Sequence, residues 1–333
     1  AVESLNGVSH RIIQCDDHCL TPCNLLDTRA AMRIGIDLGG TKIEVAVLDA
    51  QGEIVYRQRQ PTPAGDYRAT IKQVAAMVHA AESHLGVRCS VGVATPGSLS
   101  LVTGRLRNSN SICLNDQPIR QDLSHALDGR EVRIANDANC FALSEASDGA
   151  GQSAHSVFGV ILGTGVGGGM VLNKQLVIGA NAIAGEWGHN PLPWMTADEF
   201  PGRRCYCGRD GCIETFLSGP AFELDHTHQT QQKISPAKII ASAIHGDSDC
   251  LATYRRYTHR LARALAHVIN LLDPDVIVLG GGMSNIPTLS MDVSMLWDQW
   301  IFSDQVNTQL RVNTHGDSSG VRGAAWLWPA CCV

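Results

Sequence analysis

The stretch Met-Arg-Ile-Gly-Ile-Asp-Leu-Gly-Gly-Thr-Lys-Ile-Glu-Val-Ala-Val-Leu, at residues 32–48, decides the fold class of this chain. Its apolar residues alternate with other residues over 34–38, which is the period of a strand that buries one face. A Gly-Gly-Thr turn follows at 39–41, and the alternation resumes over 43–47. The stretch therefore predicts two neighbouring strands joined by a glycine turn.

A second unit of strand, glycine turn and returning strand follows at 157–162, 163–165 and 169–172. The rest of the chain alternates between helical and strand patterns. The expected helices are 69–85, 138–146, 254–272 and 321–327, and the further strands are 91–94, 132–135 and 276–279. This order predicts an α/β fold with glycine turns at strand ends, where open α/β sheets bind their ligands. The repeated unit indicates two duplicated α/β halves.

Composition excludes several classes of protein. The 333 residues are 44% hydrophobic and 17% charged, as in ordinary globular chains, which excludes disorder and coiled coils. The net charge of -6 provides no basic surface for nucleic acid, so we expect no nucleic-acid partner. The longest uncharged apolar stretch, 157–172, is glycine-rich and shorter than the roughly 20 residues of a membrane span. We therefore expect no membrane association.

Residues 1–31 differ from the rest of the chain. They show no clear periodicity and no secretory signal, and Cys15, Cys19 and Cys23 have a spacing that matches no zinc or iron–sulfur pattern. We interpret 1–31 as an N-terminal extension outside the fold. Twelve cysteines in a chain without export features predict reduced thiols or metal ligands, so we expect a cytoplasmic protein.

Three glycine clusters, at 39–40, 163–169 and 280–282, each follow an apolar strand. Any one of them is explained as a tight turn, but three together favour a nucleotide, because glycine lets backbone N–H groups approach phosphate oxygens. A Walker A loop is excluded because no Gly-Lys pair exists. The fingerprint Gly-x-Gly-x-x-Gly at 163–168 fits a dinucleotide site, but there a helix must follow, and here a strand does.

A hairpin-type phosphate clamp remains after these exclusions. Asp37 lies on the polar face of the first strand, directly before the glycine turn. A carboxylate there is suited to hold a hydrated Mg²⁺ opposite the phosphates, because hard cations bind carboxylate and water oxygens. The alternative is an aspartate that only stabilises the turn.

A cysteine cluster follows His189, in the pattern Cys205-x-Cys207-Gly-x-x-Gly-Cys212. One imidazole and three thiolates match a closed structural zinc site, and the glycines let the chain fold around the metal. The alternative is three unrelated cysteines and a stray histidine. Because four protein ligands leave no open position, we expect this zinc to organise the loop and not to activate water.

Five segments together resemble one known family, the ROK sugar kinases. They are Asp37-Leu-Gly-Gly-Thr-Lys42, Asn136-Asp137-Ala-Asn139, Gly185-Glu-Trp-Gly-His189, Cys205 to Glu214, and Gly280-Gly-Gly282. The likeness covers 32 to about 329 and is strongest to the bacterial fructokinase, or manno(fructo)kinase, branch, which the segments 186–194 and 316–329 resemble. It implies an actin-like ATPase (ribonuclease H-like) fold. Two α/β domains would flank a cleft: 32–148, to which a C-terminal helix at 317–330 returns, and a larger domain, 149–316, with the zinc loop.

The resemblance also implies roles for the matched residues. Asp137 would be the catalytic base, although the residues alone explain it equally well as a helix N-cap. The sugar contacts would be Asn136, Glu186, His189 and Glu214. The phosphate side would comprise Asp37, Gly39, Gly40, Thr41, Lys42, Gly163, Thr164 and Gly165, and the adenosine side Gly280, Gly281 and Gly282. His189 would bind zinc through one ring nitrogen and present the other to the sugar.

The function implied is ATP-dependent phosphorylation of a hexose hydroxyl, with fructose to fructose 6-phosphate as the leading reaction and mannose as a further substrate. The alternative within the family is N-acetylglucosamine or another hexose. A sugar-responsive repressor needs a DNA-reading module before the kinase-like body, and 1–31 are too short, acidic and aperiodic to supply one. The expected cofactors are ATP, Mg²⁺ and structural Zn²⁺, the partners are a hexose and MgATP, and the expected assembly is a homodimer.

Overall fold

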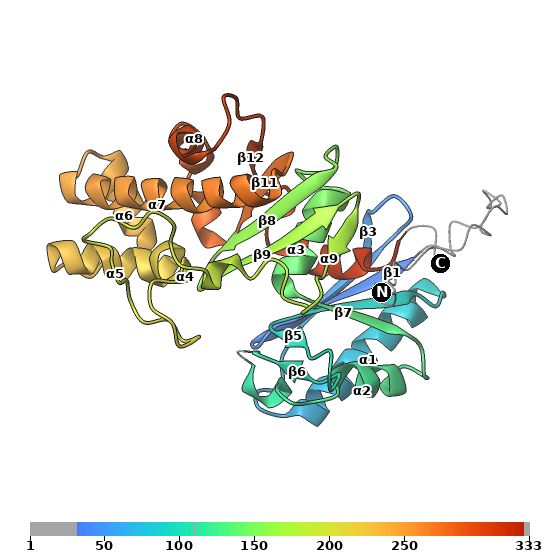
Figure 1. Cartoon of the computed structure of the whole chain (residues 1–333). Helices are drawn as coiled ribbons and strands as arrows, with labels where there is room; N and C mark the ends of the chain where they lie inside the picture. Colours follow the sequence, from blue (N-terminus) through green and yellow to red (C-terminus); the bar gives the residue numbers. More distant parts are fainter. Residues whose placement is uncertain (1–31, 110, 330–333) are drawn as a thin grey trace, which may run out of the picture.

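The computed structural model describes residues 32–109 and 111–329. They form two five-stranded sheets with helices packed around them (Figure 1). The predicted extension at 1–31 and the predicted end of the last helix at 330 lie outside the described residues.

The first sheet has the strand order β3-β2-β1-β4-β7. β1 runs antiparallel to β2, and β2 to β3, whereas β1–β4 and β4–β7 are parallel pairs. Across the glycine turn, Leu38 lies opposite Ile43, as the alternation at 32–48 predicts. The strands are β1 (Arg33–Leu38), β2 (Lys42–Leu48), β3 (Ile54–Pro61), β4 (Ser90–Thr95) and β7 (Val132–Asn136).

The second sheet repeats this order as β10-β9-β8-β11-β12. β8–β9 and β9–β10 are antiparallel, and β8–β11 and β11–β12 are parallel. The returning strand begins at Val166, before the predicted 169, because glycines 167–169 belong to the strand but provide no apolar alternation. The strands are β8 (Ser156–Leu162), β9 (Val166–Leu172), β10 (Gln175–Val177), β11 (Val276–Gly280) and β12 (Gln309–Val312).

Helices cover the outer faces of both sheets. α1 (Tyr67–Leu85) and α2 (Ile119–Ala126) pack against the first sheet in one apolar cluster, and α7 (Ser248–Leu272) packs against the second in another. α7 begins before the predicted 254, because Asp247 caps it by accepting the N–H of Cys250. Its first two turns carry fewer apolar residues, so the periodicity alone marks only the later part.

Two helices are exchanged between the sheets. α3 (Asp137–Ser147) follows β7 of the first sheet but packs on the second, where a Cβ at Gly159 would lie 2.7 Å from the Ala142 Cβ. α9 (Ser319–Trp326) follows β12 of the second sheet but packs on the first, where a Cβ at Gly35 would lie 1.8 Å from the Val321 carbonyl oxygen. The two helices touch each other in the middle of the molecule (Figure 1).

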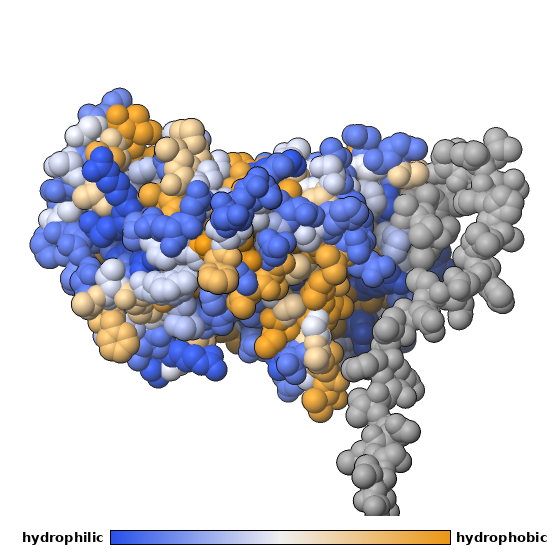
Figure 2. Space-filling view, turned by 45° about the horizontal axis from the view of Figure 1, so that its top comes forward, coloured by the Kyte–Doolittle hydropathy of each residue, from blue (hydrophilic) through white to orange (hydrophobic). Residues whose placement is uncertain are grey.

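A group of further helices extends the second half at one end of the molecule (Figure 1). They are α4 (Glu214–Leu217), α5 (Gly219–Thr230), α6 (Pro236–Ile244) and α8 (Leu289–Ser294). A small hairpin, β5 (Ser98–Leu99) with β6 (Leu106–Arg107), extends the first half. On the face shown in Figure 2, hydrophobic residues gather near the middle and hydrophilic residues cover much of the rest. Among the described residues, no helix is both long and apolar enough to cross a bilayer.

Candidate active site

The glycine run at 167–169 of β9 is the surface on which the site is assembled. A Cβ on Gly168 would lie 2.7 Å from Cδ1 of Trp187, and one on Gly169 would lie 2.8 Å from Oδ1 of Asn139. Two elements therefore pack directly on this strand: the 3₁₀ turn Trp187–His189 and the first turn of α3. Residues predicted from two separate motifs are brought together because these glycines have no side chains.

Asp137 is the first residue of α3, directly after β7. Asn136 caps this helix by accepting the N–H of Asn139 at 2.7 Å, which leaves its side-chain NH₂ for a ligand. The Asp137 side chain is accessible to solvent, yet protein surrounds it on several sides. The resulting desolvation raises the pKa of Asp137, and the hydrogen bond from the N–H of Ala138 partly offsets this rise. The helix N-cap, the alternative role considered for Asp137, is therefore Asn136.

Asp37 is the second-last residue of β1, so its carboxylate and Asp137 lie at the carboxyl ends of β1 and β7, on either side of β4. Burial, and then repulsion from the carboxylates of Asp137 and Glu44, raise the pKa of Asp37 to about 6. A Cβ on Gly320 of α9 would lie 3.4 Å from its Oδ2. A divalent cation beside Asp37 would relieve this repulsion, so the residues fit Mg²⁺.

Two further carboxylates belong to the same group. Burial raises the pKa of Glu186, the residue before the Trp187–His189 turn, and the carboxylates of Asp137 and Glu214 raise it further, while His189 opposes them. Glu214, the first residue of α4, accepts the N–H of Val166 through Oε2 at 3.0 Å. The structure thus brings together the four predicted sugar-side residues and Asp137.

The four predicted zinc ligands also converge. One ligand atom from each of His189, Cys205, Cys207 and Cys212 lies within 4.8 Å of the others. The Sγ atoms of Cys207 and Cys212 are 3.5 Å apart, and Sγ of Cys205 is 3.6 Å from Nδ1 of His189. A tetrahedral zinc with Zn–S near 2.3 Å needs ligand separations of about 3.8 Å. The donor set and its dimensions fit zinc.

Tyr206 is a residue of the site that the sequence did not single out. Its hydroxyl lies 2.9 Å from Nε2 of His189, and its ring meets the imidazole edge to face at 5.1 Å. In this structure, Nε2 of His189, the nitrogen expected to face the sugar, is bonded to the Tyr206 hydroxyl. A tyrosine between two ligand cysteines is visible in the sequence, but its orientation depends on how the loop folds.

A cavity of about 1070 Å³ lies on the other side of the glycine turn 163–165. This volume is that of a small-molecule site, and the lining is mostly apolar, as a nucleoside requires. Gly163, Thr164 and Gly282 border it, and its apolar walls come from α5, α6 and the turn after β11: Pro220, Leu224, Ile240, Ile244, Met283 and Ile286. Thr164 also borders a smaller cavity of about 230 Å³ with Tyr206 and Glu214. The turn 163–165 therefore lies between the large apolar cavity and the small cavity beside Glu214, and it borders both.

The other predicted glycines have packing roles. A Cβ on Gly280 would lie 2.4 Å from the Phe141 ring, and one on Gly281, whose φ is 82°, would lie 2.5 Å from the Leu162 carbonyl oxygen. Neither borders the large cavity, so of the predicted adenosine-side glycines only Gly282 does. Gly165 packs against Glu214, since a Cβ there would lie 2.6 Å from Oε2.

The turn of the first half is more open. Gly39 closes it by donating its N–H to the carbonyl of Lys42 at 3.0 Å, and Gly40, Thr41 and Lys42 are exposed. A Cβ on Gly40 would lie 3.0 Å from Oγ of Ser111. The backbone of these exposed residues and the Lys42 ammonium are suited to contact an anion.

Comparison with known proteins agrees with this geometry. The ROK family model matches residues 33–331. An N-acetyl-D-glucosamine kinase of Escherichia coli O139:H28 is 40% identical over 300 residues, covering 89% of this chain and 99% of the relative.

Two solved structures are also similar. The ROK hexokinase of Thermus thermophilus has a TM-score of 0.79 at 31% identity, over 89% of this chain and 97% of its own. A ROK family glucokinase of Streptomyces griseus, in complex with glucose and AMPPNP, has a TM-score of 0.71 at 26% identity, over 89% and 98%. The fold is the actin-like ATPase fold of these kinases, and the chain belongs to the ROK family as one of its sugar kinases.

Proposed function

We propose that this sugar kinase transfers the γ-phosphoryl group of ATP to a hydroxyl of N-acetyl-D-glucosamine. The support for this sugar is the Escherichia coli relative of that name, which matches across nearly its whole length. The sequence-based preference for fructose was drawn from 186–194 and 316–329, and the comparisons favour the alternative instead. Fructose and mannose remain the competing substrates in the test below.

The observation that carries the proposal is the placement of two carboxylates and one glycine turn. Asp37 and Asp137 lie at the carboxyl ends of two parallel strands, β1 and β7, that flank β4, within electrostatic reach of each other. Thr164 borders both the large apolar cavity and the small cavity beside Glu214. A nucleotide in the large cavity would direct its phosphates along this turn towards the carboxylates.

In the proposed reaction, the sugar hydroxyl oxygen attacks the γ-phosphorus and the bond from that phosphorus to the bridging oxygen of ADP breaks. Asp137 accepts the hydroxyl proton, a role that contributes about 10²–10⁴-fold to the rate. Its raised pKa makes the ionised carboxylate a better proton acceptor than an aspartate of ordinary pKa. Asn136, Glu186 and Glu214 hold the other sugar hydroxyls, and His189 contributes through its bond to Tyr206.

Two metals complete the proposal. Asp37 would hold a hydrated Mg²⁺, which neutralises charge on the phosphate oxygens. Gly39, Gly40, Thr41 and Lys42 would contact the phosphates from the first half, and Gly163 to Gly165 from the second. His189 and the three cysteines would hold a structural Zn²⁺, whose role is to fix the 205–212 loop beside the sugar. We further propose domains at 32–148, with the returning helix, and at 149–316, and a homodimer.

The test is a coupled ADP-release assay with MgATP and purified, zinc-replete protein. We expect the highest kcat/KM on N-acetyl-D-glucosamine, with fructose, mannose and glucose as competing substrates. Highest turnover on fructose would restore the sequence-based preference and keep the mechanism. Binding of ATP and sugar without turnover of any hexose would refute the catalytic proposal.

A further inference from the structure

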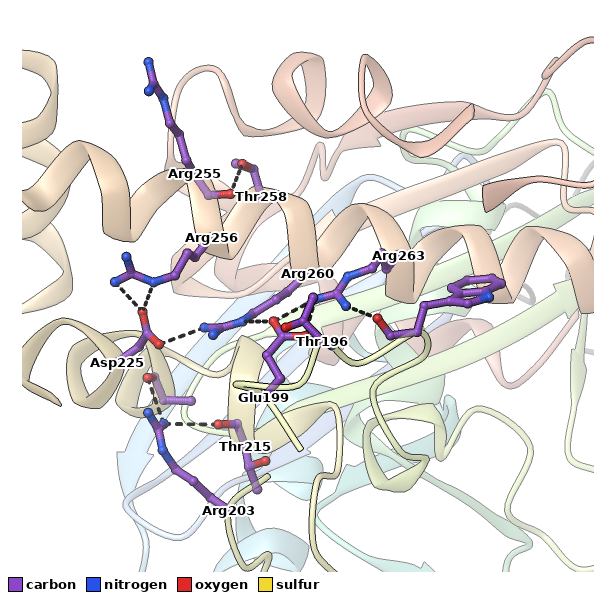
Figure 3. A network of polar contacts seen from close by, with 12 residues as sticks. Thr196, Glu199, Arg203, Thr215, Asp225, Arg255, Arg256, Thr258, Arg260 and Arg263 are labelled. Atoms are coloured by element: carbon purple, nitrogen blue, oxygen red, sulfur yellow. Dashed lines mark hydrogen bonds and ion pairs between the residues drawn. The ribbon is translucent and has the colours of Figure 1, made fainter. Parts of the chain in front are cut away.

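A buried network of charged side chains joins α5, α7 and the segment 190–204 (Figure 3). Glu199 is at its centre. Its carboxylate accepts Nε of Arg260 at 2.8 Å, Nη2 of Arg263 at 2.8 Å to each oxygen, and the N–H of Thr196 at 3.1 Å. Arg263 also donates to the carbonyl of Trp194. No residue of this network belongs to the site described above.

The segment that Glu199 anchors carries the site. It runs from the end of the Trp187–His189 turn to Cys205, so it connects the sugar-side turn to the zinc loop. Between this turn and α4, the described chain has no helix or strand. Its backbone is paired by two isolated bridges, Pro191–Cys212 and Arg204–Asp210, and by a few single hydrogen bonds. Side-chain contacts must therefore add to this sparse backbone pairing, and Glu199 provides buried ion pairs that attach the segment to α7.

A second arm of the network leads to the nucleotide side. Arg260 donates through Nη1 to Oδ1 of Asp225 at 2.9 Å, while its Nε binds Glu199. Asp225 is on α5, next to Glu223 and Leu224, which border the large cavity. One planar guanidinium thus bridges the segment that carries the sugar side and the helix that forms a wall of the cavity.

The energetics of the network favour a geometric role. Burial alone would raise the pKa of Glu199, but the hydrogen bonds from Arg260 and Arg263 lower it to about 2, so the carboxylate stays ionised. Buried ion pairs are weak contributors to stability, because desolvation of the charges offsets their attraction. A guanidinium with two fixed partners does, however, define distance and angle on both sides.

The geometry points to Arg260 as a positioning residue that serves both substrate sites. Through Glu199 it fixes the segment that carries the sugar-side turn and the zinc loop, and through Asp225 it fixes α5 at the nucleotide cavity. This inference rests on the function proposed above, because it assumes a sugar on one side and a nucleotide on the other.

The test uses one substitution for each arm. Glu199→Gln keeps the shape of the side chain but weakens the sugar arm, and Asp225→Asn does the same for the nucleotide arm. We expect Glu199→Gln to raise KM for the sugar roughly tenfold and to change KM for MgATP less than about twofold, since small displacements of binding groups are costly. We expect the reverse split for Asp225→Asn, and an increase in both KM values for Arg260→Lys.

The matched control is Arg255→Gln on the same helix. Arg255 is exposed, and its side chain projects away from the network (Figure 3). We expect both KM values of this variant to equal those of the wild type. Zinc content and the thermal midpoint are measured for every variant, so that KM values are compared only between folded, metal-loaded proteins.

Equilibrium titration of each variant with sugar and with AMPPNP separates the two proposals. Equal weakening of both ligands by Glu199→Gln, or a lowered thermal midpoint with unchanged affinities, would overturn the positioning role. If the wild type binds both ligands but turns over no sugar, the proposed function fails, and the split in affinities still decides the role of Arg260. If the wild type binds neither ligand, both proposals fail.

Discussion

The two halves of the molecule have the same frame but different chemical groups. Both sheets have two antiparallel pairs followed by two parallel pairs in the same order. Gly35 and Gly159 occupy the same position in the central strands β1 and β8, and each lies against an exchanged helix. The second-last residue of the strand, however, is Asp37 in β1 and Ile161 in β8. At this position the first half has a carboxylate, and the second half has an apolar side chain.

The two halves also differ in the length of the glycine turn and in the segments added to the sheet. In the first half Leu38 pairs with Ile43, and in the second half Leu162 pairs with Val166, so the second turn is one residue shorter. The second half also carries the cysteine loop 205–212 and the helices that form the large cavity. Two halves with the same strand order thus carry different groups. Under the proposed function, the first half supplies the two aspartates that act on the reacting groups, and the second half supplies the walls of the large cavity.

The largest expected effect is at the carboxylate that follows β7. Asp137→Asn should lower kcat about 10²–10⁴-fold, because the amide cannot accept the hydroxyl proton. Sugar affinity, measured by titration, should change little and serves as the control for folding. Turnover near the wild-type level in the ADP-release assay would show that Asp137 is not the base.

The wild-type pH profile gives an independent check of the same residue. Only the ionised carboxylate accepts a proton, so kcat/KM should fall as the pH is lowered through the pKa of Asp137. Because desolvation raises this pKa, the fall should occur above the ordinary range of an aspartate.

Substitution of the equivalent glycines, Gly35 and Gly159, tests whether the exchanged helices pack equally closely on the two sheets. Gly35→Ala places a Cβ against a backbone oxygen, and Gly159→Ala places it against the Cβ of Ala142. Both neighbours are fixed to backbone, but the overlap is deeper at Gly35 (1.8 Å) than at Gly159 (2.7 Å). We therefore expect Gly35→Ala to destabilise by about 3 kcal/mol or more and Gly159→Ala by about 1–3 kcal/mol. Thermal midpoints compare the two, and the reverse order would show that the first frame is the looser one.

Asp37→Asn tests the difference between Asp37 and Ile161 directly. In the folded protein the pKa of Asp37 is about 6, so the folded state binds its proton more tightly than the unfolded state. Stability therefore falls as pH rises from about 4 to about 6, and above this range the ionised carboxylate destabilises the fold by about 1–3 kcal/mol. Without Mg²⁺ at pH 8, the variant should be more stable by this amount and yet have greatly reduced activity.

The same variant contains its own control. The gain in stability should shrink as the pH approaches about 4, where the wild-type carboxyl group is protonated in the folded state. If the gain in stability of Asp37→Asn did not depend on pH, the cause would be the shape of the side chain and not the loss of its charge.

The smallest effect is expected in the cysteine loop 205–212, the proposed zinc site. Tyr206→Phe removes the hydroxyl that binds Nε2 of His189. Loss of such a partner weakens metal affinity about tenfold or more, because the partner orients the ligand ring. A chelator competition measures zinc affinity, and Tyr254→Phe, far along the sequence on α7, is the control. Unchanged zinc affinity with an altered sugar KM would instead assign the hydroxyl to the sugar.

Much of the frame was predictable because periodicity reports it directly. The alternation at 32–48 and the strand at 157–162 predicted β1, β2 and β8, and the spacing at 205–212 predicted the convergence of one histidine and three cysteines. These signals are local, since a strand or a chelating loop is specified by residues close together in the chain.

The rest depends on contacts between distant residues. The pairing of Glu199 with Arg260 spans 61 positions, and nothing near either residue indicates it. The packing of Gly280 against Phe141 likewise removes a glycine from the predicted nucleotide side. The comparisons favour N-acetyl-D-glucosamine over the predicted fructose. The sequence pattern could not decide between them, because loops around the cleft set the choice of sugar and their shapes have no sequence period.

The exchange of α3 and α9 has a consequence for synthesis of the chain. Arg322 of α9 donates to the carbonyl of Gly52, 270 residues earlier, in the turn between β2 and β3. At about 5–20 residues per second, roughly 15 to 50 s separate the emergence of that hairpin from the emergence of the helix that covers it. During this interval the face of the first sheet around Gly35 lacks its partner. Nascent chains should therefore depend on protection by chaperones until the last helix has left the ribosome.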